Sequence, residues 1–303
     1  MLRIGITMGD PLGIGAEIIL KALPKFRAGL AFKVFGDPEL LPGLEPGELQ
    51  PVAVSKSEKR YAPREAGQAS VAYLDRAMQA WRAGEIDALV TAPISKTHVQ
   101  AAGFPFPGHT EYLAAQTRTE KFVMMMAGPR LRVSLVTIHE PLSRVPALLT
   151  REKILDTVEV TYRALRERFR LREPRLAVCG LNPHAGENGL LGREEIEILA
   201  PALAEAARRG FPCAGPKVPD AVFHEAYEGK WDAVVCMYHD QGLIPFKMIH
   251  FQDGVNVTLG LPLVRTSPDH GTAFDIAGQG FADSGSMEAA IRLAAELARK
   301  EPS

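Results

Sequence analysis

The sequence predicts an α/β protein made of two α/β/α domains with a cleft between them. Short runs rich in valine, isoleucine and leucine alternate with longer runs of helical periodicity, and this alternation is typical of a mostly parallel sheet covered by helices. The chain also has 303 residues, which exceeds the size at which one hydrophobic core usually stops growing. Its length is therefore more consistent with two domains than with one.

The strands and helices of this pattern follow one another from the N-terminus. Two of the strand segments are almost continuously apolar, as strands buried on both faces are. The expected strands cover residues 2–8, 86–91, 132–138 and 175–181. The expected helices cover residues 14–26, 151–169 and 193–209, and a last helix is expected from Met287.

No segment between these elements has the composition of an interdomain linker. The stretch 38–51 is rich in proline, glycine and glutamate, and it is better explained as a surface loop. We therefore expect the chain to cross between the domains more than once. The expected first domain comprises residues 1–130 and 253–303, and the expected second domain comprises residues 131–252.

Charge and composition favour an enzyme that acts on small molecules. The formal net charge is -1, so the protein has no basic field that would attract nucleic acid or an anionic membrane surface. No apolar run is long enough to span a bilayer, and the start of the chain lacks the features of a signal peptide. Because Cys179, Cys213 and Cys236 are odd in number and widely spaced, we expect free thiols and a cytoplasmic protein.

Three histidines come directly after three strand-like runs. RVSLVTI precedes His139, RLAVCGLNP precedes His184, and DAVVCMY precedes His239. Ligands of open α/β sheets bind beyond the carboxyl ends of the strands, so three strands would bring three imidazoles to one edge. Three neutral imidazoles with open positions are typical of a catalytic site for zinc or cobalt. The sequence therefore predicts a divalent metal bound by these histidines.

Each histidine has a simpler explanation when it is taken alone. A histidine after a strand often caps the strand or bonds to a loop, and the long spacings match no compact zinc motif. The coincidence of three such histidines is what favours a shared metal. Asp240, which follows His239, is a further ligand, a carboxylate that orients the histidine, or a plain loop residue.

Two turns have the character of anion sites. GDPLGIG at 9–15 joins a strand to a helix and offers backbone N–H groups, but it is neither a GxGxxG nor a Walker A motif, and a plain tight turn explains it equally well. In PGHTEYL, Thr110 is the expected N-cap directly after His109, so a hydroxyl, an imidazole and helix N–H groups would face one spot. A phosphate or carboxylate suits that spot, and an ordinary capped surface helix is the alternative.

Polar groups also surround the strand-like run GVNVTLGLP. Lys247 precedes this run, Asn256 lies within it and Arg265 follows it, and such groups can bind an anionic substrate. Ordinary surface residues are the alternative. The next segment, PDHGTAFDIAGQGFADSG, is rich in glycine and aspartate, and its Asp275 is placed to accept ribose hydroxyls, unless the segment is a plain surface loop.

Together these motifs resemble the 4-hydroxythreonine-4-phosphate dehydrogenase family of pyridoxal phosphate biosynthesis. The resemblance covers nearly the whole chain and rests on GDPLGIG, TAPISK, GHTEYL, VCGLNPHAGENG, MYHDQG and GVNVTLGLPLVRTSPDHGTA. HGTAFDIAGQG also resembles the adenosine-binding loop of isocitrate and isopropylmalate dehydrogenases. This implies their fold and a site for NAD or NADP without a GxGxxG motif.

The resemblance implies a role for each matching position. The implied metal ligands are the same three histidines, and the metal is zinc, cobalt or magnesium. The implied substrate contacts are His109, Thr110, Lys247, Asn256 and Arg265. The implied cofactor contacts are His270, Gly271, Thr272, Asp275 and Asp283. The candidates for the general base are Asp220, Asp240 and Lys247. A homodimer is also implied, with the metal site near the subunit interface, the cofactor loop in the first domain and the metal ligands and dimer surface in the second.

The implied reaction oxidises the C3 hydroxyl of 4-phosphohydroxy-L-threonine with NAD or NADP to 2-amino-3-oxo-4-phosphooxybutanoate. This product loses carbon dioxide to give 3-amino-2-oxopropyl phosphate. A paralogous dehydrogenase of a four-carbon sugar-acid phosphate, threonate 4-phosphate, would use the same residues. A metal hydrolase and a phosphotransacetylase-like acyltransferase are alternatives from other classes, which the HGTAFDIAG loop disfavours. Asp275 would favour NAD, because its carboxylate repels a 2′-phosphate.

Overall fold

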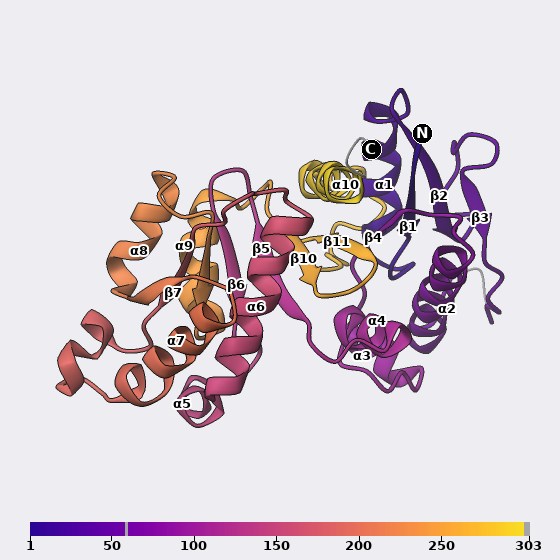
Figure 1. Cartoon of the computed structure of the whole chain (residues 1–303). Coiled ribbons are helices and arrows are strands. Elements are labelled where there is room, and N and C mark those ends of the chain that lie inside the picture. The colour runs from indigo at the N-terminus through magenta and orange to yellow at the C-terminus, as the bar shows by residue number, and fades with distance from the viewer. Residues whose placement is uncertain (58–59, 300–303) are drawn as a thin grey trace. The chain divides into compact units, whose positions relative to one another are not determined.

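The chain folds into two compact units. The computed structural model describes residues 1–57 and 60–299. The first unit comprises Met1–Thr119 and Leu261–Ser303, and the second comprises Glu120–Gly260. Figure 1 shows that each unit is a sheet with helices packed against it, which is the α/β class that the alternation of strands and helices predicts.

The first unit is built on parallel strands. Their order is β3-β2-β1-β4-β11, and each neighbouring pair is parallel. The central strand β4 is buried along its whole length, and β1 is buried from Ile4 to Thr7. The strands are β1 (Leu2–Thr7), β2 (Leu30–Gly36), β3 (Leu49–Pro51), β4 (Ala88–Thr91) and β11 (Val264–Pro268).

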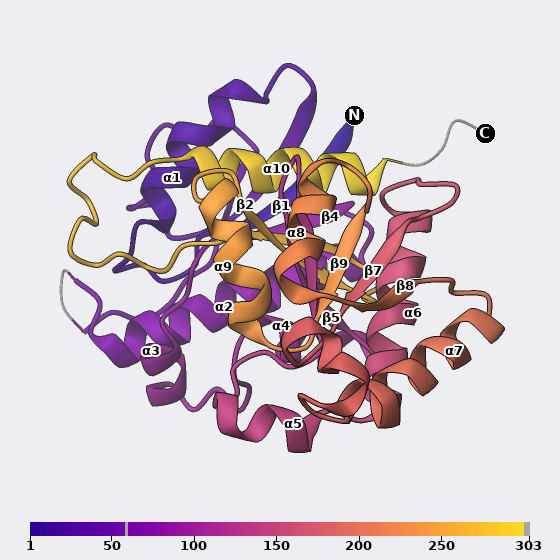
Figure 2. The same ribbon diagram turned by 90° about the vertical axis from the view of Figure 1, so that its left-hand side faces the viewer.

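Helices cover both faces of this first sheet. Figures 1 and 2 show α1 and α10 on one face and α2 on the other. The helices of the first unit are α1 (Gly15–Ala22), α2 (Pro63–Arg82), α3 (Lys96–Ala101), α4 (His109–Thr117) and α10 (Gly285–Ala298), with the 3-10 turn η1 (Leu23–Lys25). The helix expected over 14–26 ends at Ala22, because Pro24 lies in that turn and has no N–H for a longer helix.

The second unit contains a mixed sheet. Its strand order is β10-β5-β6-β9-β7-β8, in which β10 and β5, and β5 and β6, are antiparallel, whereas β6, β9, β7 and β8 are parallel. The strands are β5 (Val123–Ala127), β6 (Arg132–Leu135), β7 (Leu176–Cys179), β8 (Ala214–Lys217), β9 (Ala233–Cys236) and β10 (Val255–Leu259).

Helices cover both faces of the second sheet as well. Figure 2 shows α8 and α9 in front of β9, and α6 lies on the opposite face. The helices are α5 (Val145–Leu148), α6 (Arg151–Glu167), α7 (Ala200–Arg208), α8 (Pro219–Tyr227) and α9 (His239–Ile249). The tighter or wider turns are η2 (Leu142–Arg144), η3 (Pro183–Gly189) and the π-helical η4 (Glu195–Leu199). No helix in residues 1–57 or 60–299 combines the length and apolar character that crossing a membrane requires.

The domain boundaries differ from those expected. Residues 120–130 and 253–260 belong to the second unit, although the sequence pattern placed them in the first. The reason is strand pairing: β5 pairs with β6, and β10 pairs with β5, so both segments are hydrogen-bonded into the second sheet. The first unit is discontinuous in sequence, whereas the second is a single continuous segment.

Candidate active site

The three predicted metal ligands follow three neighbouring strands of the second unit. β6, β9 and β7 lie side by side and are parallel, so their carboxyl ends meet at one edge of the sheet. His139 comes shortly after β6, His239 is the first residue of α9 after β9, and His184 lies in η3 after β7. Each of the three histidines therefore follows a strand that ends at this edge.

Two of the histidines lie close together. The ring centroids of His139 and His239 are 5.6 Å apart, with the planes inclined at 39°. The Nδ1 atom of His239 lies 2.7 Å from Oδ1 of Asp240, which leaves Nε2 as the nitrogen that can face a ligand. A carboxylate on the second ring nitrogen is the usual companion of a metal-binding histidine, because it fixes the tautomer and the ring orientation.

His184 is not gathered with this pair. No group of three or more histidine, cysteine, aspartate or glutamate side chains that could hold a metal ion occurs within residues 1–57 and 60–299. His184 is exposed, and its Nδ1 lies 3.2 Å from Oε2 of Glu187, so its Nε2 is also the nitrogen left for a ligand. The donor chemistry of all three residues fits a divalent metal, while their joint coordination stays a prediction.

The three candidates for the general base lie on two helices of the second unit. Asp220 is an exposed residue in the first turn of α8. Asp240 is 70% exposed and bonds to His239, so one of its oxygens already orients an imidazole. Lys247 is half-buried and lies about two turns after His239 on α9.

A buried cation of the first unit lies on β11 and bonds to the last residue of β4. Arg265 is 4% exposed, and its Nε and Nη2 atoms donate hydrogen bonds to Oγ1 of Thr91 at 3.1 and 2.7 Å. Burial lowers the pKa of Arg265 to about 10, and the charge of Glu111 acts in the opposite direction. The guanidinium therefore stays charged at neutral pH, and an anion that entered its surroundings would be strongly attracted.

Thr91 was given no role by sequence reasoning. It lies in TAPISK, one of the motifs of the resemblance, and it is the last residue of the buried strand β4. A threonine at the carboxyl end of a parallel strand is a signal that the strand-end rule could have found.

The helix start at α4 differs in one detail from the expectation. Gly108, not Thr110, is the N-cap, because the chain is extended at Gly108 and becomes helical at His109. His109 and Thr110 therefore occupy the first turn of α4, where backbone N–H groups point out of the helix. Burial, and then the charge of Arg265, hold the pKa of His109 well below its usual value of 6.5. Its imidazole is neutral and able to donate one hydrogen bond.

Asn256 in the second unit carries an unusual acceptor. It lies on β10 opposite Met126, and its side-chain Oδ1 is buried without a hydrogen-bond partner among the described residues. A buried acceptor without a donor costs free energy, so such an atom points to a ligand that supplies the donor. An amino group is a ligand of that kind.

The predicted cofactor loop is held by α1 and α3 of the first unit. The N–H of Ile14 donates to the carbonyl of Thr272 at 3.0 Å, which joins GDPLGIG to the loop. The ring of Phe274 stacks on His98 with 5.2 Å between centroids, and His98 in turn bonds to the buried Asp10 at 2.7 Å. GDPLGIG thus supports this loop through its backbone.

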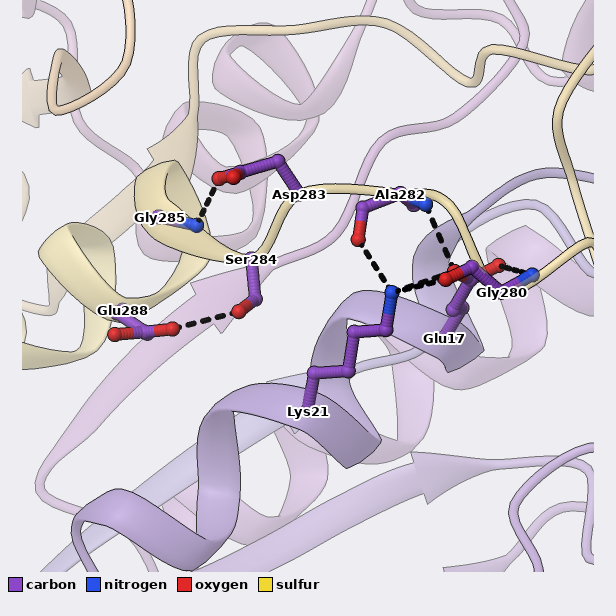
Figure 3. A network of polar contacts seen from close by, with 8 residues as sticks. All are labelled: Glu17, Lys21, Gly280, Ala282, Asp283, Ser284, Gly285 and Glu288. Atoms are coloured by element: carbon purple, nitrogen blue, oxygen red, sulfur yellow. Dashed lines mark hydrogen bonds and ion pairs between the residues drawn. The ribbon is translucent and has the colours of Figure 1, made fainter.

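Figure 3 shows how the other end of the loop is fixed. Lys21 on α1 donates to the carbonyls of Gly280 and Ala282, both at 2.7 Å, and to Oε1 of Glu17 at 2.9 Å. Glu17 in turn accepts the N–H groups of Ala282 at 2.8 Å and Gly280 at 3.3 Å. Sequence reasoning gave this pair no role, although its spacing of four residues on a helix is a recognisable ion-pair pattern.

The cofactor residues named from the resemblance lie along this loop. The Nδ1 atom of His270 lies 3.1 Å from the carbonyl of Gly271, whereas its Nε2 is buried without a hydrogen-bond partner among the described residues. Asp275 is exposed, as a residue that meets ribose hydroxyls would be. One carboxylate oxygen of Asp283 accepts the N–H of Gly285 at 2.7 Å, at the start of α10, and so has a structural role (Figure 3).

A family model described as "Pyridoxal phosphate biosynthetic protein PdxA" matches residues 22–294. The chain belongs to this family. A relative from Geobacter metallireducens, named 4-hydroxythreonine-4-phosphate dehydrogenase, is 47% identical over 98% of this chain and 96% of its own length. The solved structure of 4-hydroxythreonine-4-phosphate dehydrogenase from Klebsiella pneumoniae matches with a TM-score of 0.89 and 38% identity, over 99% of this chain and 100% of that one. The family predicted from the motifs is thus confirmed.

Two further solved structures share the fold at lower sequence identity. A terephthalate 1,2-cis-dihydrodiol dehydrogenase from Burkholderia xenovorans matches with a TM-score of 0.70 and 30% identity, over 97% of this chain and 98% of that one. The isocitrate dehydrogenase of Methylococcus capsulatus matches with a TM-score of 0.54 and 15% identity, over 98% of this chain and 85% of that one, which supports a common fold alone. The predicted likeness to the isocitrate dehydrogenase fold is confirmed.

Proposed function

We propose that the protein oxidises 4-phosphohydroxy-L-threonine with NAD or NADP. The product, 2-amino-3-oxo-4-phosphooxybutanoate, is a β-keto acid that loses carbon dioxide to give 3-amino-2-oxopropyl phosphate. The observation that carries the proposal is the edge formed by β6, β9 and β7, where three strands of a PdxA-family chain are each followed by a histidine. The names of the relatives support the same reaction.

The proposed metal ligands are His139, His184 and His239. Two of them have a carboxylate at Nδ1, which leaves Nε2 as the nitrogen that can bind the metal. When bound, a divalent ion such as zinc, cobalt or magnesium supplies Lewis-acid chemistry that lowers the pKa of a substrate hydroxyl.

The proposed substrate contacts divide between the two units. His109, Thr110 and Arg265 belong to the first unit, and Lys247 and Asn256 belong to the second. The charge of Arg265 suits a phosphate or carboxylate, and the neutral imidazole of His109 can donate to the same anion. The Oδ1 atom of Asn256 has no hydrogen-bond partner among the described residues, so it can accept a hydrogen bond from the amino group of the substrate.

The proposed cofactor contacts are His270, Gly271, Thr272, Asp275 and Asp283. The unpartnered Nε2 of His270 and the exposed carboxylate of Asp275 are polar groups that a dinucleotide would meet on this loop. A carboxylate near the ribose favours NAD over NADP. The proposed candidates for the general base are Asp220, Asp240 and Lys247. All three are kept, because a weak base is sufficient when the substrate hydroxyl has a lowered pKa.

The test measures metal content and turnover together. Elemental analysis of the purified protein is combined with reduction of NAD or NADP in the presence of 4-phosphohydroxy-L-threonine. We expect His184→Ala to lose bound metal and turnover while its circular dichroism spectrum stays that of the wild type. Full turnover in the presence of a strong chelator contradicts the proposal.

A second candidate substrate is a four-carbon sugar-acid phosphate, threonate 4-phosphate. The match to a structure titled as a terephthalate 1,2-cis-dihydrodiol dehydrogenase favours keeping it, because a relative with this fold is named for a different alcohol substrate. Comparison of kcat/KM for the two substrates decides between them.

We also propose that the protein is cytoplasmic and forms a homodimer. The proposed dimer contact is made by α9. Ile244, Met248 and Phe251 are 61, 84 and 77% exposed, and they lie on or just after the helix that His239 begins. An exposed apolar row of this kind suits the same row on a second copy, with the metal ligands nearby. Light scattering should show that Met248→Glu is a monomer. The control is Leu142→Glu, at an exposed leucine of the second unit outside α9, and it should stay dimeric.

A further inference from the structure

A buried carboxylate binds the backbone that leads to His184. Glu195 is only 4% exposed, and its Oε1 accepts the N–H groups of Leu181 at 2.8 Å and Asn182 at 2.7 Å. Its Oε2 accepts a third hydrogen bond, from Nδ2 of Asn182 at 2.9 Å. A buried carboxylate with three donors is well compensated, and such charge-assisted bonds are about twice as strong as neutral ones.

The segment that follows Leu181 and Asn182 has an unfavourable backbone conformation. All five residues from His184 to Asn188 have positive φ angles, between 42 and 79°. For residues other than glycine this conformation costs roughly 1–2 kcal/mol each, so it persists only where neighbouring contacts impose it. The backbone conformation of His184 therefore depends on contacts outside its own turn.

The shape of Glu195 also fits this turn closely. A Cβ atom built on Gly186 would lie 2.7 Å from Oε2 of Glu195, and one built on Gly180 would lie 3.2 Å from Oε1. Glycine at these two positions lets the backbone approach the carboxylate. Glu195 is also the first residue of the π-helical turn η4, and π-helical turns are frequent at functional sites.

We propose that Glu195 is a positioning residue that holds the His184 turn in the conformation required for metal binding. The inference rests on the proposed function, because it assumes that His184 is a ligand. Glu195 acts through the backbone of Leu181 and Asn182 and through the amide of Asn182. It does not itself contact the imidazole in any described hydrogen bond.

The substitution Glu195→Gln tests whether both carboxylate oxygens are needed as hydrogen-bond acceptors. In Glu195→Gln the amide Nε2 would face Nδ2 of Asn182, which is also a donor. Rotating the Asn182 amide would not relieve the conflict, because Nδ2 of Asn182 also donates to Oε2 of Glu194 at 2.8 Å. The substitution thus keeps the size of the side chain and removes one of its acceptors.

The experiment measures the affinity of the intact protein for Zn²⁺ and Co²⁺ by competition with a chromophoric chelator. We expect Glu195→Gln to bind each ion about 10- to 100-fold more weakly than the wild type, as for other residues that orient metal ligands. The Co²⁺ absorption spectrum should also change in its ligand-field bands. The matched control is Glu197→Gln, two residues away, whose exposed carboxylate pairs with Arg193 and makes no hydrogen bond to Leu181 or Asn182 among the described contacts.

A second variant disturbs the contact between Glu195 and the His184 turn by a change in the turn itself. Gly186→Ala places a methyl group against Oε2 of Glu195, and it should weaken metal binding as well. Its control is Gly210→Ala, which has the same kind of positive φ, at 87°, with open space around the added methyl. Thermal unfolding of each apo variant shows whether folding is intact, and Gly186→Ala decides the question if Glu195→Gln does not fold.

The possible outcomes separate the inference from the proposed function. Wild-type protein that binds neither ion overturns the proposed metal site, and the inference falls with it. Wild-type protein that binds metal, together with a Glu195→Gln variant of equal affinity and unchanged Co²⁺ spectrum, overturns the inference alone. A lower melting temperature without loss of metal affinity also overturns it, because Glu195 would then stabilise the fold only.

Discussion

The hydrogen bonds between Arg265 and Thr91 connect a buried charge to a strand end. Thr91→Val keeps the shape of the side chain and removes the oxygen that accepts from the guanidinium. A hydrogen bond to a charged group is worth about 1.5–3 kcal/mol, which corresponds to about tenfold or more in affinity. We expect KM for the phosphorylated substrate to rise by about that factor.

Steady-state kinetics of Thr91→Val and Thr91→Ser measure this effect. Serine retains the hydroxyl, so Thr91→Ser should keep a KM close to that of the wild type. Equal KM values for the valine and serine variants would show that the hydroxyl of Thr91 does not contribute to substrate binding through Arg265.

His109 makes the stability of the protein depend on pH in a defined direction. Its pKa is well below 6.5 in the folded chain, so the unfolded chain binds more protons once the pH falls below about 6.5. Above this value both states are neutral at His109, and below it the free energy of unfolding falls by up to about 1.4 kcal/mol per pH unit.

Thermal unfolding between pH 8 and pH 5.5, a range of about 2.5 units chosen around the ordinary histidine pKa, measures this dependence. The wild type should lose more stability than His109→Gln as the pH falls. The prediction fails if the two melting temperatures decline in parallel.

At the scale of elements, the strands were the most predictable parts. The runs RVSLVTI, RLAVCGL and DAVVCMY contain β6, β7 and β9, and a rule about strand ends was enough to assign three histidines to one edge. The irregular elements were not predictable from periodicity. The positive φ angles of η3 follow residues whose N–H groups bond to Glu195, and no local sequence pattern encodes such a tertiary contact.

The pair formed by Glu17 and Lys21 predicts an effect on the loop that it holds. Lys21→Met removes the donors to Gly280 and Ala282, and we expect the dissociation constant for NADH to rise about threefold to tenfold. The estimate is modest because Lys21 is partly exposed. Fluorescence titration with NADH measures it.

Lys33→Met is the control for this substitution. It removes a comparable ion pair, with Glu85, that does not touch the loop. Zn²⁺ affinity should be unchanged in both variants, since Lys21 and Lys33 belong to the first unit and the histidines to the second. Loss of NADH affinity in both variants would point to a general effect of lost ion pairs.

At the scale of the whole molecule, length and pattern predicted two units, but not the residues at which they divide. The sequences of β5 (VMMMA) and β10 (VNVTL) do not indicate the unit to which these strands belong, and their antiparallel pairing assigns them to the second unit. Binding roles divide in the same way, since the proposed metal ligands lie in the second unit and the proposed cofactor residues in the first.

This division predicts two separate patterns of hydrogen exchange. Zn²⁺ should slow exchange in the turns that follow β6, β7 and β9, because a ligand that binds only the native state suppresses local opening around it. NADH should slow exchange in residues 269–284. Mass-spectrometric exchange with each ligand alone tests both, and protection of the opposite segment by either ligand would contradict the assignment.

The discontinuity of the first unit has a consequence for biosynthesis. The second unit is complete once Gly260 has left the ribosome, and it can fold while the remainder is still being translated. The first unit must wait, because β11 has not yet joined β4 and α10 has not yet covered it. During that interval one edge of β4 can pair with any other strand, so the nascent chain is most vulnerable to mispairing just before residues 261–303, about a seventh of the sequence, emerge.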